Sequence, residues 1–156
     1  MRLWRIATDT RDYEAHDTSG AGAAKSAGRW NAPGTPMLYC ALNPSLACLE
    51  TMAHLGATLP LNRYLVSLEV PDAVWAKAPY RATTSLPVGW DAIPEGIVSV
   101  RVGQEWVKSA GSAILLVPSA IVPEDVVVLI NPQHPDAAGI TARKLRKWLY
   151  DPRLRA

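Results

Sequence analysis

The polar residues that could carry chemistry lie in four short segments of the chain. These are Gly28-Arg29-Trp30-Asn31, Glu50, Pro118-Ser119 and Asn131-Pro132-Gln133-His134-Pro135. An arginine in a glycine-rich segment can hold a phosphate or a carboxylate through two parallel hydrogen bonds, or it can stabilise its own loop. Both roles fit Arg29 about equally well. Trp30, which directly follows it, could line a pocket.

Glu50 is expected to lie on a helix, at the edge of an apolar stripe and one turn after Leu46. A carboxylate in that position is partly desolvated, and Arg29 or Arg5 could balance its charge. A structural salt bridge explains the pattern nearly as well as a functional acid does.

The remaining polar residues are less specific. Ser119 lacks the Gly-x-Ser-x-Gly elbow and has no base near it in sequence, so we expect it to form hydrogen bonds rather than act as a nucleophile. His134 stands between two prolines, where a turn-stabilising role is favoured over a catalytic one. His16 and His54 are not spaced for a metal site, and we expect no metal.

The pattern of apolar and turn-forming residues predicts the elements that must position these side chains. An irregular segment is expected over residues 9–35, because glycines interrupt any periodic pattern there. Asn43 is a plausible helix cap and Pro44 a suitable first helical residue. The expected helices are 44–56 and 99–110, and the expected strands are 37–41, 63–70, 113–117 and 126–130. Residues 140–150 fit either a helix or a strand.

Length and composition favour one α+β domain spanning residues 1–156, with mixed or antiparallel sheets and a few helices. The longest apolar runs fall far short of the roughly 18 residues that cross a bilayer, so we expect no membrane association. Cys40 and Cys48 match no zinc pattern and no paired framework, which favours reduced thiols and a cytoplasmic protein.

The C-terminal residues are basic, but no nucleic-acid motif accompanies them, and we expect no direct nucleic-acid binding. No phosphate-binding glycine fingerprint follows a strand, which disfavours a Rossmann or P-loop enzyme.

The order of these pieces closely resembles the RES domain family, named for an Arg, a Glu and a Ser, whose members are toxins of bacterial Xre–RES toxin–antitoxin pairs. The matching motifs span nearly the whole chain. They are Leu3-Trp4-Arg5-Ile6, Gly28-Arg29-Trp30-Asn31, Leu38-Tyr39-Cys40-Ala41, Leu46-Ala47-Cys48-Leu49-Glu50, Gly89-Trp90, Val117-Pro118-Ser119-Ala120, Leu129-Ile130-Asn131-Pro132 and Asp151-Pro152-Arg153-Leu154. One departure is Val126, which stands where many members have Asn.

The resemblance implies a fold like that of ADP-ribosyltransferase toxins, with NAD as a substrate and no cofactor. Carried over by motif, the catalytic residues are Arg29, Tyr39, Glu50 and Ser119. The residues expected to bind NAD or a phosphate co-substrate are Arg5, Arg29, Trp30, Asn31, Tyr39, Asn131 and His134. The implied partner is an Xre-type helix-turn-helix antitoxin that covers the active site.

The expected reaction is NAD phosphorolysis, which releases nicotinamide and ADP-ribose 1″-phosphate. Cleavage of the ribose–nicotinamide bond passes through a positively charged state, which a carboxylate such as Glu50 would stabilise. The nearest alternative is ADP-ribosyl transfer to a protein at the same NAD site, and the sequence does not separate the two. An alternative of another class is a non-catalytic interaction module that uses the basic tail and exposed tryptophans.

Overall fold

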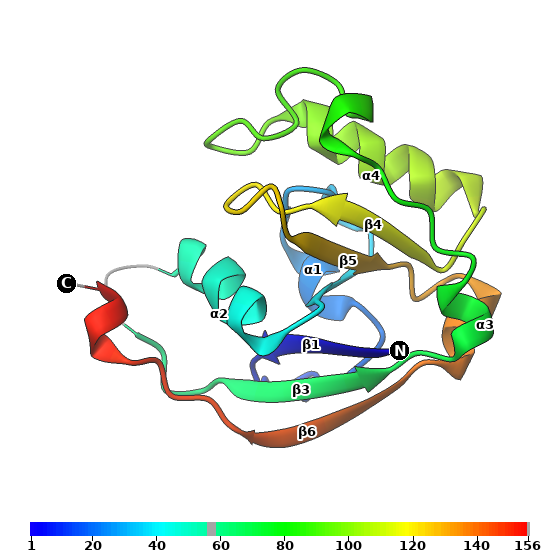
Figure 1. The fold of residues 1–156 in the computed structure, drawn as a ribbon. Coiled ribbons are helices and arrows are strands. Elements are labelled where there is room, and N and C mark those ends of the chain that lie inside the picture. Colours follow the sequence, from blue (N-terminus) through cyan, green and yellow to red (C-terminus); the bar gives the residue numbers. More distant parts are fainter. Residues whose placement is uncertain (56–58, 156) are drawn as a thin grey trace.

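The computed structural model describes residues 1–55 and 59–155 and shows one antiparallel sheet in the strand order β4-β5-β2-β1-β3-β6 (Figure 1). The strands are β1 (Arg2–Ala7), β2 (Leu38–Ala41), β3 (Tyr64–Glu69), β4 (Ile114–Pro118), β5 (Val126–Ile130) and β6 (Thr141–Lys147). Each pair of neighbours is antiparallel. The predicted α+β class is therefore confirmed. None of the helices described is long and apolar enough to cross a membrane.

Short helices connect and cover the strands. They are α1 (Ala21–Lys25), α2 (Pro44–Ala53), α3 (Asp72–Trp75) and α4 (Ile97–Ser109), with 3-10 turns at Thr83–Ser85, Pro135–Gly139 and Pro152–Arg155. The start of α2 is as predicted, because the Asn43 side chain accepts a hydrogen bond from the Leu46 N–H at 2.8 Å and Pro44 follows the cap. The helix ends at Ala53, and its predicted end at Gly56 lies outside the described residues.

The structure corrects the sequence prediction in two places and settles a third that was left open. Residues 2–7 form a strand that was not predicted. The segment over 9–35, expected to be irregular throughout, contains the short helix α1. Residues 141–147 form β6, which settles the open choice over 140–150 in favour of a strand. As an edge strand β6 has both faces largely exposed, and its lysines and arginines disfavour pairing with another chain.

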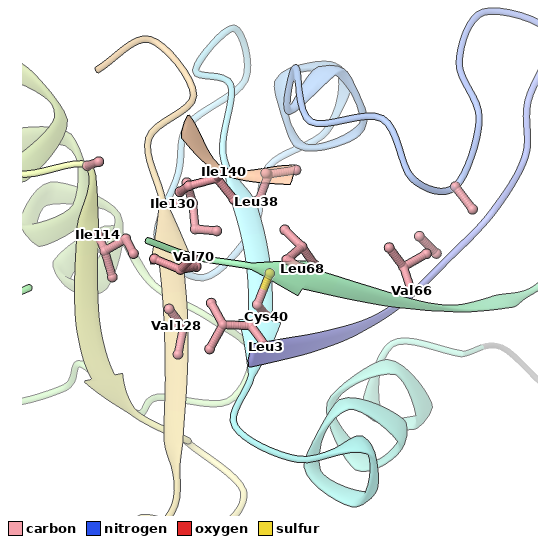
Figure 2. Close-up of a cluster of buried hydrophobic side chains, with 13 residues drawn as sticks. Leu3, Leu38, Cys40, Val66, Leu68, Val70, Ile114, Val128, Ile130 and Ile140 are labelled. Atoms are coloured by element: carbon pink, nitrogen blue, oxygen red, sulfur yellow. The ribbon is translucent and has the colours of Figure 1, made fainter. Parts of the chain in front are cut away.

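Side chains from both halves of the sheet meet in one apolar cluster (Figure 2). Leu3, Val66 and Leu68 come from β1 and β3, and they pack with Cys40 of β2 and Val128 of β5. A second cluster joins α4 and Trp30 to β4 and β5, and a third places α2 against the opposite face of β1 and β3. The shared core holds the halves β4-β5-β2 and β1-β3-β6 together.

The two halves are joined by a short pairing between β1 and β2. The register of these strands consists of the pair Trp4–Ala41, whereas β1 and β3 pair over all six residues of β1. Beyond Trp4 and Ala41, the end of β1 and the start of β2 are therefore free to line a cavity rather than a continuous ladder.

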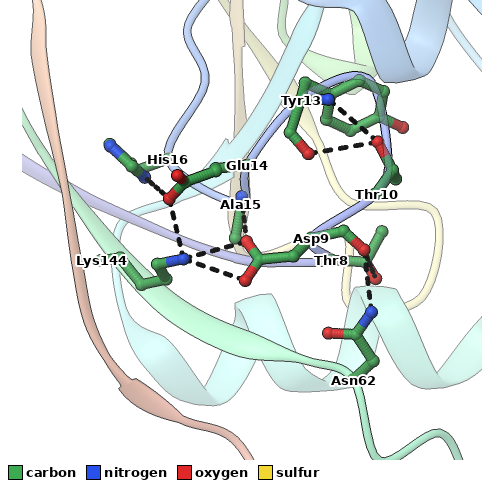
Figure 3. Close-up of polar contacts among 9 residues, drawn as sticks. All are labelled: Thr8, Asp9, Thr10, Tyr13, Glu14, Ala15, His16, Asn62 and Lys144. Carbon is green, nitrogen blue, oxygen red and sulfur yellow. Dashed lines mark hydrogen bonds and ion pairs between the residues drawn. The ribbon is translucent and has the colours of Figure 1, made fainter.

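The start of the long segment before β2 is fixed to the edge of the sheet (Figure 3). The Lys144 ammonium on β6 contacts both carboxylate oxygens of Asp9, at 3.0 and 2.9 Å, and Oε2 of Glu14, at 2.9 Å. The Asp9 carboxylate also accepts a hydrogen bond from the Ala15 N–H at 2.7 Å. This backbone bond and Lys144 lower the pKa of Asp9, so the carboxylate stays charged and the contact persists at neutral pH.

Candidate functional site

A cavity of about 450 Å³ lies where the pairing of β1 with β2 ends. Its walls come from the end of β1, the start of β2, the segment before β2, and α2. Arg5, Arg29, Tyr39 and Glu50, which were predicted as site residues, all line it. The volume falls within the range of sites that bind small molecules and cofactors.

The Glu50 carboxylate is held by Ser119. The Ser119 Oγ donates a hydrogen bond to Glu50 Oε1 at 2.6 Å and accepts one from each of the backbone N–H groups of Ile121 and Val122, both at 3.0 Å. Ser119 is fully buried. Because its one proton and both of its lone pairs are engaged, this hydroxyl positions the carboxylate and is not available as a nucleophile.

The two candidate arginines differ in their partners. Arg29 Nη1 donates to the carbonyl oxygens of Trp90, at 3.0 Å, and Ala92, at 3.1 Å. Arg5 Nη1 is buried and has no hydrogen-bond partner among the described residues. A buried cationic donor without an acceptor is costly, which makes Arg5 the better suited of the two to meet an anionic ligand.

Tyr39 joins the cavity wall to the loop that carries Arg29. Its hydroxyl accepts a hydrogen bond from the Trp30 N–H at 3.0 Å and donates one to Asn31 Oδ1 at 2.7 Å. The Asn31 amide nitrogen in turn donates to loop carbonyls, including that of Ala23 at 2.9 Å. Burial raises the pKa of the Tyr39 phenol, so the hydroxyl remains a donor at neutral pH. Trp30 and Asn31 line the cavity, and their hydrogen bonds to Tyr39 and to loop carbonyls also hold the loop in place.

Two predicted binding residues, Asn131 and His134, lie outside the cavity lining. They follow the far end of β5, where the Asn131 N–H donates to the Ala113 carbonyl at 2.9 Å. His134 Nδ1 accepts from the Asp136 N–H and its Nε2 lies 3.1 Å from the Ala110 carbonyl. This placement favours the turn-stabilising role that the sequence also allowed.

Several further polar residues that were not predicted from the sequence line the cavity, among them Tyr13, His54, Arg63 and Glu95. His54 follows Glu50 by one helical turn, and that spacing was the one available signal. Arg63 and Glu95 come from segments with no catalytic motif, so their positions depend on tertiary packing.

The cysteines are free thiols. Burial raises the pKa of Cys40 to about 11, which makes it unreactive at neutral pH. Within the described part of the chain, no three His, Cys, Asp or Glu side chains gather in a way that could hold a metal ion.

The chain is similar to a known protein family, to bacterial toxins and to a solved structure. A family model described as "RES domain" matches residues 2–152. The "Prs ADP-ribosylating toxin" of Sphingobium sp. (strain YBL2) is 60% identical over 153 residues, which are 97% of this chain and 95% of that protein. A "Toxin Res" of Yersinia enterocolitica is 33% identical over 99% of this chain and 100% of its own length. Among solved structures, the MbcT-MbcA toxin-antitoxin complex of M. tuberculosis matches with a TM-score of 0.66 and 20% identity, over 98% of this chain and 85% of that one, which shows a shared fold.

Proposed function

The chain belongs to the RES domain family, and from this premise we propose that it is the toxin of a toxin–antitoxin pair and consumes NAD by breaking its bond to nicotinamide. The observation that carries the proposal is the Glu50 carboxylate, held by Ser119 beside a cavity that also contains the unpartnered nitrogen of Arg5. An acid and a buried cation in one cavity suit a substrate that is anionic at its pyrophosphate and becomes cationic at its reacting carbon.

Glu50 acts on the ribose that carries nicotinamide. As the bond from C1″ to the ring nitrogen lengthens, positive charge develops on the sugar, and a fixed carboxylate stabilises that charge more than it stabilises the ground state. The bonding electron pair goes to the pyridinium ring, so nicotinamide leaves as a neutral molecule. Ser119 keeps the carboxylate oriented, which avoids a reorganisation cost during the reaction.

The arginines hold the other part of the substrate. Arg5 offers a buried donor to a phosphate oxygen, and charge-assisted hydrogen bonds of this kind are roughly twice as strong as neutral ones. Arg29 donates from Nη1 to two backbone carbonyls, and its other N–H groups bind the pyrophosphate. The hydroxyl of Tyr39 is engaged by the protein, and its ring is therefore the part that contacts nicotinamide or ribose.

A protein is the proposed acceptor of the ADP-ribosyl group. The support is the relative at 60% identity, whose name describes ADP-ribosylation of Prs. Inorganic phosphate is a second candidate acceptor, and the unpartnered donor of Arg5 supports it because that donor could bind a free phosphate as well as a pyrophosphate.

Product identification distinguishes the acceptors. The purified protein is incubated with NAD labelled in the adenine moiety, in parallel with purified Prs, with inorganic phosphate, and with neither. Label on Prs supports protein transfer, and ADP-ribose 1″-phosphate supports phosphorolysis. If no nicotinamide is released under any of the three conditions, the proposed function is wrong.

The proposed partner is a cytoplasmic antitoxin of the Xre type that covers the mouth of the cavity. A solved structure that shares this fold is a toxin-antitoxin complex, which supports a partner of that kind. A neighbouring reading frame that encodes a helix-turn-helix protein and whose product blocks nicotinamide release is the expected finding, and a neighbouring product that leaves the rate unchanged contradicts it.

A further inference from the structure

Residues 87–96 form a strap that connects the region after β3 to α4 and passes beside the cavity. Arg29 holds the strap through the carbonyls of Trp90 and Ala92, at 3.0 and 3.1 Å. The ring of Trp90 stacks on that of Trp30, with centroids 6.0 Å apart and planes inclined by 24°. The strap is thus fixed to the same loop that supplies Arg29 to the cavity.

This attachment brings Glu95 into the cavity wall. Glu95 lines the cavity although it is exposed to solvent, which places it at the mouth. Its carboxylate lies near enough to Tyr39 to disfavour ionisation of the phenol, while Arg29 acts on the same phenol in the opposite sense. Among the described residues, Glu95 has no hydrogen-bond or ion-pair partner.

Four acids line the cavity, and within the described part of the chain all but Glu95 have partners. Glu14 contacts Lys144, and Asp17 accepts hydrogen bonds from Ser19. Glu50 lies on α2 and is hydrogen-bonded to Ser119, whereas Glu95 lies on the strap and is unpartnered. We propose that Glu95 selects the acceptor: it orients a hydroxyl or amine of a protein side chain toward C1″ of NAD, receives its proton, and repels inorganic phosphate. The inference rests on the proposed function and deepens it by naming the residue that selects the acceptor.

The chemistry balances without another reactant. The acceptor oxygen or nitrogen forms a bond to C1″ as the bond from C1″ to the nicotinamide nitrogen breaks, and the electron pair of that bond neutralises the pyridinium ring. The acceptor proton passes to the Glu95 carboxylate and then to solvent. A phosphate anion needs no such base, and the negative charge at the mouth opposes its approach.

The test compares Glu95→Gln with Asp91→Asn in the full chain. Asp91 is a matched control, because it is an exposed acid on the same strap that does not line the cavity. Each variant is given labelled NAD with purified Prs or with inorganic phosphate, and both nicotinamide release and label on Prs are measured. Glu95→Asp is included as a conservative variant that retains the carboxylate.

The proposal predicts that Glu95→Gln lowers the labelling of Prs by at least about tenfold and raises phosphate-dependent release of nicotinamide by about threefold or more. Glu95→Asp restores part of the labelling, and Asp91→Asn stays within about twofold of the wild-type protein. If Glu95→Gln labels Prs as fast as an active wild-type protein, the assignment of Glu95 is wrong while the proposed function stands. If the wild-type protein uses phosphate and labels no protein, the assignment of Glu95 is wrong while NAD consumption stands. If it releases no nicotinamide at all, both are overturned.

Discussion

Replacing Tyr39 by Phe removes the hydroxyl that joins the cavity wall to the loop carrying Arg29. The ring and its packing are kept, so the change isolates two hydrogen bonds, one from the Trp30 N–H at 3.0 Å and one to Asn31 Oδ1 at 2.7 Å. Trp30 is 2% exposed and Asn31 is fully buried, so water does not readily replace the lost partner.

The expected loss of stability follows from the two groups that lose their partner, the Trp30 N–H and Asn31 Oδ1. A buried donor or acceptor without a partner costs about 1–3 kcal/mol, and the free energy of unfolding is expected to fall by about 3 kcal/mol for the pair. In a domain of this size each kcal/mol lowers the melting temperature by about 2–4 °C, which gives a fall of about 6–12 °C. Nicotinamide release should fall as well, because the loop that positions Arg29 loses its attachment.

Thermal and urea unfolding of the purified variant measure the effect on stability. Tyr80→Phe is the matched control, since Tyr80 is 52% exposed and removal of its hydroxyl should move the melting temperature by no more than about 1 °C. A Tyr39→Phe protein that melts within about 2 °C of the wild-type protein would show that this hydroxyl does not fix the loop.

Three further predictions concern the rest of the site and the core. Ser119→Ala releases the Glu50 carboxylate and is expected to lower kcat for nicotinamide release by at least about tenfold, with KM for NAD changed less. Gly103→Ala puts a Cβ 1.8 Å from the Trp30 carbonyl oxygen, so urea unfolding should show a loss of about 1–3 kcal/mol, and an unchanged midpoint contradicts this packing. Burial raises the pKa of Cys40 to about 11, whereas this thiol ionises near pH 9 in the unfolded chain, so its contribution to stability is complete below pH 9 and is lost as the pH rises toward 11. The free energy of unfolding of Cys40→Ala should therefore fall less over this pH range than that of the wild-type protein.

Local chemistry in the sequence accounts for much of the fold. Asn43 and Pro44 mark the start of α2. The Asn43 side chain accepts a hydrogen bond from a backbone N–H of the first turn, and Pro44 has no N–H that would be left without a partner there. The alternation over residues 64–70 marks β3, although both faces of this strand are largely buried. The apolar runs before Pro118 and Asn131 mark β4 and β5, whose residues are mostly buried. In each case the signal lies within the element itself.

The strands that the sequence missed or left open have patterns that depend on their neighbours. In β1, Arg5 breaks the apolar pattern because it projects into the cavity rather than into the core. In β6, charged residues follow one another on both faces because an edge strand exposes both.

Some features of the candidate site could likewise be predicted from the sequence, and others depend on tertiary contacts. The family motifs predicted a site formed by Arg5, Arg29, Glu50 and Ser119. The first three line the cavity, and Ser119 lies behind Glu50 and is hydrogen-bonded to it. The different partners of the two arginines and the position of Glu95 on the strap follow from contacts between segments far apart in the chain, for which the sequence carries no local signal.

The most direct test of the account is the rate of nicotinamide release from NAD by Glu50→Gln, which keeps the shape of the side chain and removes its charge. Glu124→Gln serves as the control, because Glu124 is exposed and does not line the cavity. The proposed role of Glu50 predicts that Glu50→Gln remains folded and releases nicotinamide at least about tenfold more slowly, equivalent to about 1.4 kcal/mol of barrier, while the control retains the wild-type rate. A folded Glu50→Gln protein that releases nicotinamide as fast as the wild-type protein would contradict it.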